Sequence, residues 1–253
     1  RQLTPAPSTR VRHHAGRPDP PRRSHFDVQL SIAPWGTISD TSSVRGDMAE
    51  ERFDEAIAVT RDIHWVGFHD REAHLHCNPY LLIDDEDAVL FDPGSIPYFA
   101  VSMRKVIDLV KPSEISIIVA SHQDPDVCGN LAIVEDVIDR ADLRIVAHSR
   151  TARLIRHLGL RSELWESDKH DGKLVLKSGR VLRFIPTPYL HAPGAIATYD
   201  EKTRSLFTSD LFGGLSEHWS LFARGDWVHT LTPWHQEYMP SGALLRHCME
   251  QLE

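Results

Sequence analysis

Short apolar runs follow one another at close intervals from about residue 60 onward. Residues 63–66, 80–83 and 88–91 are β-type runs, and an acidic turn at 84–87 separates the last two. Because these runs lie so close together in the chain, we expect them to be antiparallel neighbours. Residues 115–120 form a continuous apolar run, which is typical of a strand that is buried on both faces.

Amphipathic stretches between and after these runs predict helices. Apolar residues recur at helical spacings over residues 97–110, until Pro112 stops the pattern. Further helices are predicted at 130–139, 150–158 and 241–253, and further strands at 143–147, 173–176, 181–186, 195–199 and 205–208. This order of elements predicts two sheets packed together with helices outside them.

Residues 1–50 do not share this periodicity. Five prolines lie among Arg, Ser and His within the first 21 residues, and no apolar pattern is sustained there. We therefore expect a disordered or loosely attached leader over residues 1–50, followed by a folded domain over residues 51–253.

Composition narrows the classes of function. The formal net charge is −8, and the residues after position 25 carry 22 basic and 35 acidic side chains. An acidic body argues against nucleic-acid binding, because phosphate contacts need clustered Lys and Arg. No run of 18 apolar residues occurs, which argues against a membrane span. The three cysteines form no CxxC pair, so we expect a reducing, cytoplasmic setting, while the 16 histidines point to metal chemistry.

Residues 121–130 lie where the buried apolar run ends and the next helix is expected. His122, Asp124 and Asp126 alternate there, and an extended backbone would project all three to one side. One imidazole and two carboxylates suit zinc, manganese or iron, and the oxygen ligands favour iron or manganese. The alternative is a polar turn in which an Asp caps the following helix.

Two later positions strengthen the metal hypothesis. His191 lies in a proline-bounded loop after the predicted strand 181–186, and Asp210 ends the predicted strand 205–208. A carboxylate at a strand end is a suitable bridge between two cations, since each oxygen can bind one metal. Alone, His191 fits a surface loop and Asp210 a turn. Together with the earlier motif they place two His and three Asp at the ends of three strands.

These segments resemble the metallo-β-lactamase superfamily and, within it, the di-iron branch of flavodiiron proteins and stand-alone oxygen-binding di-iron proteins. The family's H-x-E-x-D motif corresponds to residues 122–126, its TP-x-L-H-x-P loop to residues 187–193, and its LF-(S/T)-x-D-x-FG segment to residues 206–213. Residues 77–84 and 91–95 are similar to the family's opening strands and their D-P-G turn. The resemblance covers roughly residues 62–253.

The resemblance implies an αββα sandwich, in the α/β class, with a dinuclear centre of two iron ions; zinc or manganese is the alternative. It implies that His122, Asp124 and His191 bind one iron, that Asp126 binds the other, and that Asp210 bridges them. No catalytic residue beyond these ligands is implied. His235, in an aromatic-rich stretch after Asp210, is expected near the metal pocket, either as a neighbour or as a ligand.

Three departures from the family pattern matter. Superfamily hydrolases have a His directly after the motif's last Asp, where this chain has Val127. Asp124 replaces the usual Glu, which shortens the reach of that ligand by one methylene. The family's final His lies in a P-x-H-G segment that would fall beyond residue 253. Either the domain is truncated at its C-terminal end, which we expect, or the second metal lacks a ligand.

The expected function is the binding or reduction of a diatomic molecule, oxygen or nitric oxide, by a sensor or an oxidoreductase. An electron donor or an attached signalling domain is the expected partner, and a homodimer is also considered. The alternative is a zinc-dependent hydrolase of an ester, thioester or lactone, which works through a metal-bound hydroxide. We also expect Asp210→Ala to lower both metal content and thermal stability, and Asp200→Ala to be tolerated.

Overall fold

The computed structural model describes residues 53–68, 76–215, 220–223 and 227–252. All of them belong to the structural unit Glu50–Glu253. The expected leader, residues 1–50, lies outside the described residues.

The larger sheet has seven strands in the order β1-β2-β3-β4-β5-β6-β7. Strands β1 to β4 pair antiparallel, as expected for close neighbours, and β4 to β7 pair parallel. All residues of β5 are buried, in agreement with its continuous apolar sequence. The strands are β1 (Ile57–Ala58), β2 (Ile63–Trp65), β3 (Tyr80–Ile83), β4 (Ala88–Phe91), β5 (Ile115–Val119), β6 (Arg144–Ala147) and β7 (Glu163–Glu166).

The smaller sheet is antiparallel and has the order β11-β10-β9-β8. Its strands are β8 (Lys173–Val175), β9 (Val181–Pro186), β10 (Ile196–Asp200) and β11 (Ser205–Phe207). The inner faces of the two sheets share one apolar core, to which β4 contributes Phe91 and β11 contributes Phe207. The rings of Phe91 and Phe207 stack with centroids 3.9 Å apart, so this pair joins the two sheets directly.

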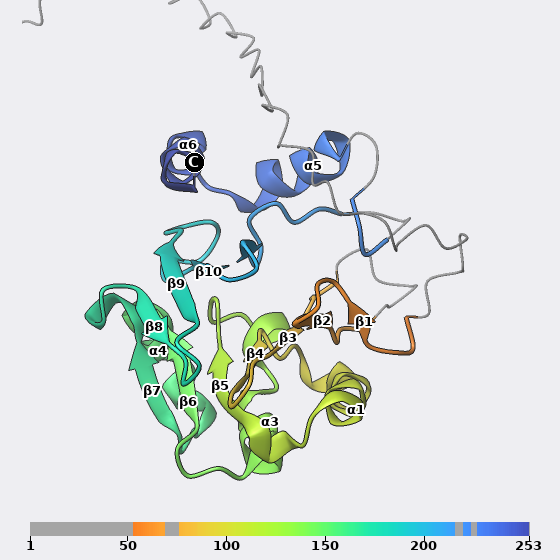
Figure 1. The fold of residues 1–253 in the computed structure, drawn as a ribbon. Coiled ribbons are helices and arrows are strands. Elements are labelled where there is room, and N and C mark those ends of the chain that lie inside the picture. Colours follow the sequence, from red (N-terminus) through yellow and green to blue (C-terminus); the bar gives the residue numbers. More distant parts are fainter. Residues whose placement is uncertain (1–52, 69–75, 216–219, 224–226, 253) are drawn as a thin grey trace, which may run out of the picture. The chain divides into compact units, whose positions relative to one another are not determined.

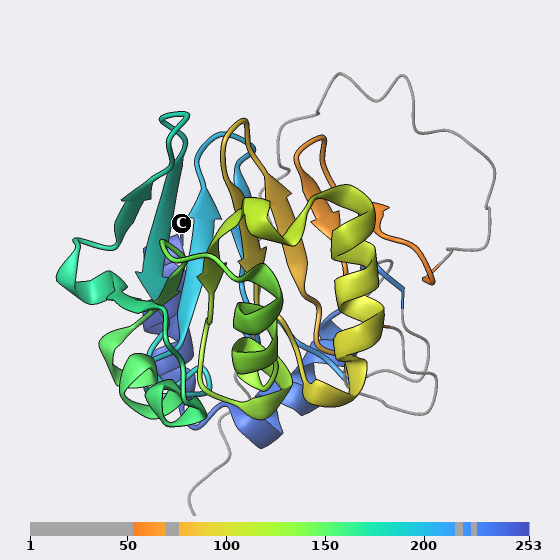
Figure 2. The ribbon, with the colours of Figure 1, turned by 90° about the horizontal axis from the view of Figure 1, so that it is seen from below.

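Helices cover the outside of the sandwich. Helices α1, α3 and α4 pack on the outer face of the larger sheet through a second apolar core, and Figure 2 shows α1 and α3 across that face. Helices α5 and α6 lie on the opposite side (Figure 1). The expected αββα sandwich is therefore confirmed. The helices are α1 (Phe99–Leu109), α2 (Pro125–Cys128), α3 (Leu131–Ile138), α4 (Ser149–Ile155), α5 (Val228–Tyr238) and α6 (Gly242–Leu252), with 3-10 turns at Ile96–Tyr98, Pro112–Glu114, Arg156–Leu158 and Ser167–Lys169.

Four elements were not predicted from the apolar pattern. Strands β1 and β7 are short and have few apolar residues. Helix α2 is a single turn. Helix α5 contains Pro233, a residue that ordinarily ends a helical pattern. It is held by tertiary contacts instead, because Trp234 packs with Leu190 and Leu211 in a third apolar core.

A group of charged side chains joins the two sheets at the end where β9 begins and β10 ends, and we call it the base cluster. Arg180 makes a bidentate pair with Asp200, through N–O distances of 2.8 and 2.6 Å. Its remaining nitrogen lies 2.9 Å from Asp62 and 3.3 Å from Asp84, which flank β2 and β3 of the larger sheet. The base cluster consists of Asp62, Asp84, Arg180, Asp200 and Lys202.

The base cluster corrects the expectation for Asp200. Its side chain is fully buried, and it accepts hydrogen bonds from Arg180 and Thr203. Removing it would leave the Arg180 guanidinium buried with part of its charge uncompensated. Asp200 is therefore a structural residue, and the expected tolerance of Asp200→Ala is wrong.

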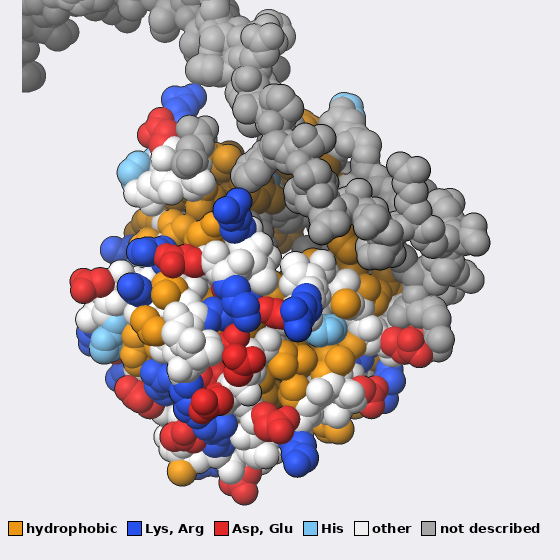
Figure 3. All heavy atoms as spheres, in the orientation of Figure 1, with side chains coloured by type: hydrophobic (Ala, Val, Ile, Leu, Met, Phe, Trp, Pro, Cys, Tyr) orange, Lys and Arg blue, Asp and Glu red, His pale blue; other side chains and the backbone are white. Residues whose placement is uncertain are grey.

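Charged side chains of both signs are interspersed on the face drawn in Figure 3. Among the described residues, no helix combines the length and the apolar character that a membrane crossing requires.

Candidate metal centre

Three loops at one end of the sandwich carry the residues that the sequence singled out. His122, Asp124 and Asp126 follow β5, His191 lies between β9 and β10, and Asp210 follows β11. Packing of the two sheets against each other brings these strand ends to the same end of the sandwich, although up to 88 residues of sequence separate them. The structure therefore brings together His122, Asp124, Asp126, His191 and Asp210, which we call the ligand cluster.

The motif after β5 is not extended throughout, as the alternation of its residues had suggested. Pro125 occupies the first turn of α2, so Asp126 lies in a helical turn and Asp124 at its N-cap position. The carboxylate of Asp124 does not cap the helix. It accepts a hydrogen bond from the Gln123 amide and lies near the two histidines, which leaves it available as a ligand.

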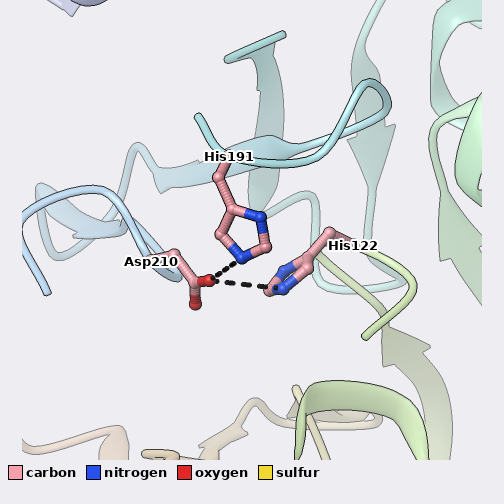
Figure 4. Close-up of side chains that lie close together, drawn as sticks. All are labelled: His122, His191 and Asp210. Atoms are coloured by element: carbon pink, nitrogen blue, oxygen red, sulfur yellow. Dashed lines mark ion pairs between the residues drawn. The ribbon is translucent and has the colours of Figure 1, made fainter. Parts of the chain in front are cut away.

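The imidazoles of His122 and His191 converge on one carboxylate oxygen of Asp210, as Figure 4 shows. The Nε2 atoms of His191 and His122 lie 2.8 and 3.4 Å from that oxygen. The same two nitrogens lie 3.3 and 3.6 Å from one oxygen of Asp124. Two overlapping groups can each hold a cation, with donor atoms within 4.8 Å of one another: His122, His191 and Asp210, and His122, Asp124 and Asp126.

The two ring nitrogens of His122 differ, since one has a hydrogen-bond partner and the other only the longer ion-pair contacts to Asp124 and Asp210. Its Nδ1 lies 3.2 Å from the Ser209 hydroxyl, which orients the ring. Its Nε2 is buried and makes no hydrogen bond, although it points at the carboxylates. A buried polar atom without a hydrogen bond costs free energy, and a cation at this point would satisfy it.

Electrostatics at the ligand cluster are dominated by the carboxylates. Burial by itself lowers the pKa of His122, but Asp124, Asp210 and Asp92 outweigh it and raise the pKa to about 9. The contact with Asp210 raises the pKa of His191. Burial, with repulsion from Asp210, raises the pKa of Asp126. The raised pKa values mean that these side chains keep their protons to higher pH, and bound metal cations could take the place of those protons.

Two further contacts hold the ligand loops, and the sequence analysis assigned neither. Asp92, in the D-P-G turn after β4, accepts a hydrogen bond of 2.8 Å from the Ser121 backbone N–H, next to His122. Thr151 of α4 donates a hydrogen bond of 2.9 Å to the Gly194 carbonyl, in the loop that carries His191. The D-P-G turn was a usable signal for Asp92. Thr151 had none, because its role depends on the packing of α4.

The structure does not bring His235 into the ligand cluster. Its Nδ1 lies 3.0 Å from the Leu231 carbonyl, and its Nε2 accepts a long hydrogen bond of 3.4 Å from the Phe212 N–H. These contacts tie α5 to the loop after Asp210. Its neighbours Trp234 and Tyr238 are closer to the site, with rings 6.3 and 6.0 Å from that of His191.

The position that follows Asp126 faces the interior. Val127 is 2% exposed and packs in the apolar core under α1 and α3. Cys128, next to it, is buried and donates its S–H to the Gln123 carbonyl. Neither side chain belongs to the groups that can hold a cation among the described residues.

The chain is similar to a protein family and to several known proteins. The model of the ODP family beta lactamase matches residues 75–253. The "Putative diflavin flavoprotein A 1" of Thermosynechococcus vestitus is 29% identical over 186 residues, which cover 73% of this chain and 29% of the relative. The "Flavo-diiron protein FprA2" of Clostridium acetobutylicum is 26% identical over 137 residues, 54% of this chain and 34% of the relative. The chain thus spans about a third or less of these relatives' length.

One solved structure, the "Peroxy diiron species of chemotaxis sensor ODP", superposes on this chain with a TM-score of 0.64 and 24% sequence identity. The superposition covers 78% of this chain and 81% of that one. At this level of identity the likeness establishes the shared fold.

Proposed function

The chain belongs to the ODP family beta lactamases, and from this premise we propose that its ligand cluster holds two iron ions that bind or reduce oxygen or nitric oxide. The relatives include a protein named as flavo-diiron and a sensor described as a peroxy diiron species. These names support iron over the other metals that the donor atoms would accept.

The observation that carries the proposal is the state of His122. Its Nε2 is buried without a hydrogen bond, it faces Asp124 and Asp210, and its Nδ1 is held by Ser209. A metal-ligating histidine ordinarily has this arrangement, with one nitrogen oriented by a partner and the other directed at the cation. The donor set of two imidazoles and three carboxylates suits iron.

We assign the ligands as the family resemblance implies, and the five donors lie together in the ligand cluster. His122, Asp124 and His191 would hold one iron, Asp126 the other, and Asp210 would bridge them. When bound, such a pair of ions supplies open coordination positions and electrons for a diatomic ligand. The protein's own part is to hold the donors in place: Ser209 orients His122, Asp92 fixes the backbone before it, and Thr151 fixes the loop of His191.

The whole protein's activity could be that of a sensor or of a reductase. A reductase needs an electron donor, and a sensor needs a signalling partner. The match to longer diflavin relatives favours the first, and the match to the chemotaxis sensor favours the second. Both share the step that the ligand cluster supports, which is binding of the diatomic molecule at iron.

The hydrolase alternative is less well supported. Superfamily hydrolases use a His directly after the motif's last Asp, and here that position is Val127, which packs in the core. The second cation would therefore lack the imidazole that a hydrolytic centre requires.

Anaerobic purification with metal analysis tests the proposal. We expect iron to exceed zinc in the isolated protein, and nitric oxide to give an iron–nitrosyl spectrum. His191→Ala should lower the iron content, whereas His235→Ala, on a nearby helix but outside the cluster, should retain it. Near-stoichiometric zinc without iron would contradict the proposal and favour hydrolysis.

A further inference from the structure

A cavity of about 310 Å³ lies beside the ligand cluster and extends into the sandwich. At one end it is bounded by Asp126 and Asp210, which are the proposed ligand of the second iron and the proposed bridge. His122, Asp124 and His191 are not among the described residues that line it. The site therefore has two sides, one that faces the cavity and one that does not.

The side away from the cavity faces solvent. The side chains of Asp124 and His191 are 30% and 23% exposed. Water and polar reactants can reach this side directly. Polar molecules therefore do not need the cavity to reach the site. The residues that line the cavity indicate what else it could admit.

Part of the lining comes from the inner faces of β2, β3, β4 and β11, and the rest comes mainly from loops, among them residues 76–78, 208–209 and 212–214. Ile63, Tyr80, Phe91 and Phe207 contribute apolar side chains. The Phe207 ring stacks on Phe91 and meets Tyr80 edge-on, with centroids 5.6 Å apart, so three rings form one wall next to the metal end. Polar side chains contribute to the lining as well, among them those of Asn78, Ser205 and Thr208.

Strand register gives the direction of the cavity. Tyr80 pairs with Phe91, which immediately precedes Asp92 at the metal end, whereas Ile63 pairs with Leu82, two residues further along β3. At about 3.3 Å per residue, the cavity therefore reaches about 7 Å beyond the Tyr80 pair. Val59, in the turn that precedes β2, also lines it and is 37% exposed, so this far end lies near the surface.

We propose that this cavity is the entry route by which an apolar diatomic gas reaches the metal side formed by Asp126 and Asp210. The inference rests on the proposed function. Oxygen and nitric oxide are small and of low polarity, and the stretch of the cavity beside Ile63, Phe91 and Phe207 is apolar. Apolar cavities of this kind take up small molecules such as xenon. Polar reactants can approach from the opposite side, where Asp124 and His191 meet solvent.

Xenon tests the cavity without any metal. In metal-free protein with labelled methyl groups, xenon under pressure should shift the NMR signal of Ile63 and leave that of Ile155, in the core under the outer helices, unchanged. Phe207→Leu, which enlarges the cavity, should increase xenon binding. Unshifted Ile63 signals, or xenon binding that does not respond to Phe207→Leu, would overturn the proposal.

Nitric oxide tests the route. Ile63→Phe fills the cavity, and in iron-loaded protein we expect it to slow association of nitric oxide by on the order of 10-fold at unchanged iron content. Ile117→Phe is the matched control, because Ile117 is equally buried in the same core but does not line the cavity. A wild-type association rate in a xenon-excluding Ile63→Phe protein would overturn the route alone. Failure of the iron-loaded wild type to bind nitric oxide at all would overturn the proposed function, and the route with it.

Discussion

Each end of the sandwich carries a group of acidic residues, and the two groups are built differently. At one end, every carboxylate of the base cluster contacts Arg180, Lys202 or both. At the other end, Asp124 and Asp210 form ion pairs only with His122 and His191 among the described residues. The base cluster is therefore neutralised by side chains that stay positively charged, whereas the ligand cluster depends on histidines, whose charge changes with pH.

The difference separates residues that stabilise the fold from residues that keep a site ready. Three aspartates in the base cluster have buried or partly buried side chains and fixed partners, so their charge supports the junction of the two sheets. Burial, with repulsion from Asp210, raises the pKa of Asp126 in the ligand cluster and of Asp92 beside it. Such unfavourable ionisation is typical of functional sites, and bound cations would relieve it.

The largest effect is expected from Arg180→Met. The change would leave Asp62, Asp84 and Asp200 without their shared guanidinium, and breaking a buried pair in this way costs about 3–5 kcal/mol. Urea unfolding of the metal-free protein measures the loss. The matched control is Arg183→Met, whose pair with Glu201 is exposed and contributes less than about 1 kcal/mol. Equal losses from the two substitutions would mean that the base cluster is not a structural junction.

The two ends should also respond to pH with opposite signs in the metal-free protein. Burial raises the pKa of Asp84 and of Asp200, but hydrogen bonds from Arg180 and other donors outweigh it and lower both. A lowered carboxylate pKa gives stability that is complete above the unfolded value and lost as the pH falls through the folded one. The base cluster should therefore lose stability below about pH 4.

The ligand cluster should lose stability as the pH rises. The carboxylates around His122 raise its pKa from 6.5 to about 9 against the effect of burial, so the stability contributed by its protonated form is complete below pH 6.5 and disappears through pH 9. Burial raises the pKa of Asp92 to about 6, which adds a loss between its ordinary value and that pH. Melting temperatures recorded across the pH range check both arms. If the loss of stability at high pH is unchanged after iron loading, the group that causes it is not a metal ligand.

A smaller effect of the opposite direction is expected from Asp126→Asn. It removes a half-buried negative charge whose pKa is raised by burial and by Asp210, so the metal-free protein should gain about 0.5–1 kcal/mol while its iron affinity falls. Unfolding in urea, with and without iron, measures both. Asp136→Asn, at an exposed position on α3, should change neither quantity. A loss of stability in metal-free Asp126→Asn would show that this carboxylate supports the fold.

The comparison also indicates what could be predicted from the sequence. Most strands and helices were expected because their apolar runs are continuous or periodic, as in β5 and α1. The metal motifs could be found because their residues follow strands directly. Helix α5 could not be predicted from its pattern, because Pro233 interrupts it and tertiary packing around Trp234 decides the outcome.

Asp200 and Asp210 show the limit most clearly. Both are aspartates at the end of a strand, and the local sequence offers little to separate them. Only the three-dimensional arrangement places a buried arginine against Asp200 and two histidines against Asp210. Long-range partners therefore decide whether such a carboxylate is structural or a ligand.

The central claim is that the ligand cluster is completed by two cations that Asp210 holds together. Anaerobic calorimetric titration of ferrous iron into metal-free protein tests it most directly, with Asp210→Ala measured alongside. We expect the wild type to bind two iron ions per chain and to melt at a higher temperature when loaded, and Asp210→Ala to bind at most one, weakly. Two iron ions bound by Asp210→Ala, with an unchanged melting temperature, would contradict the account.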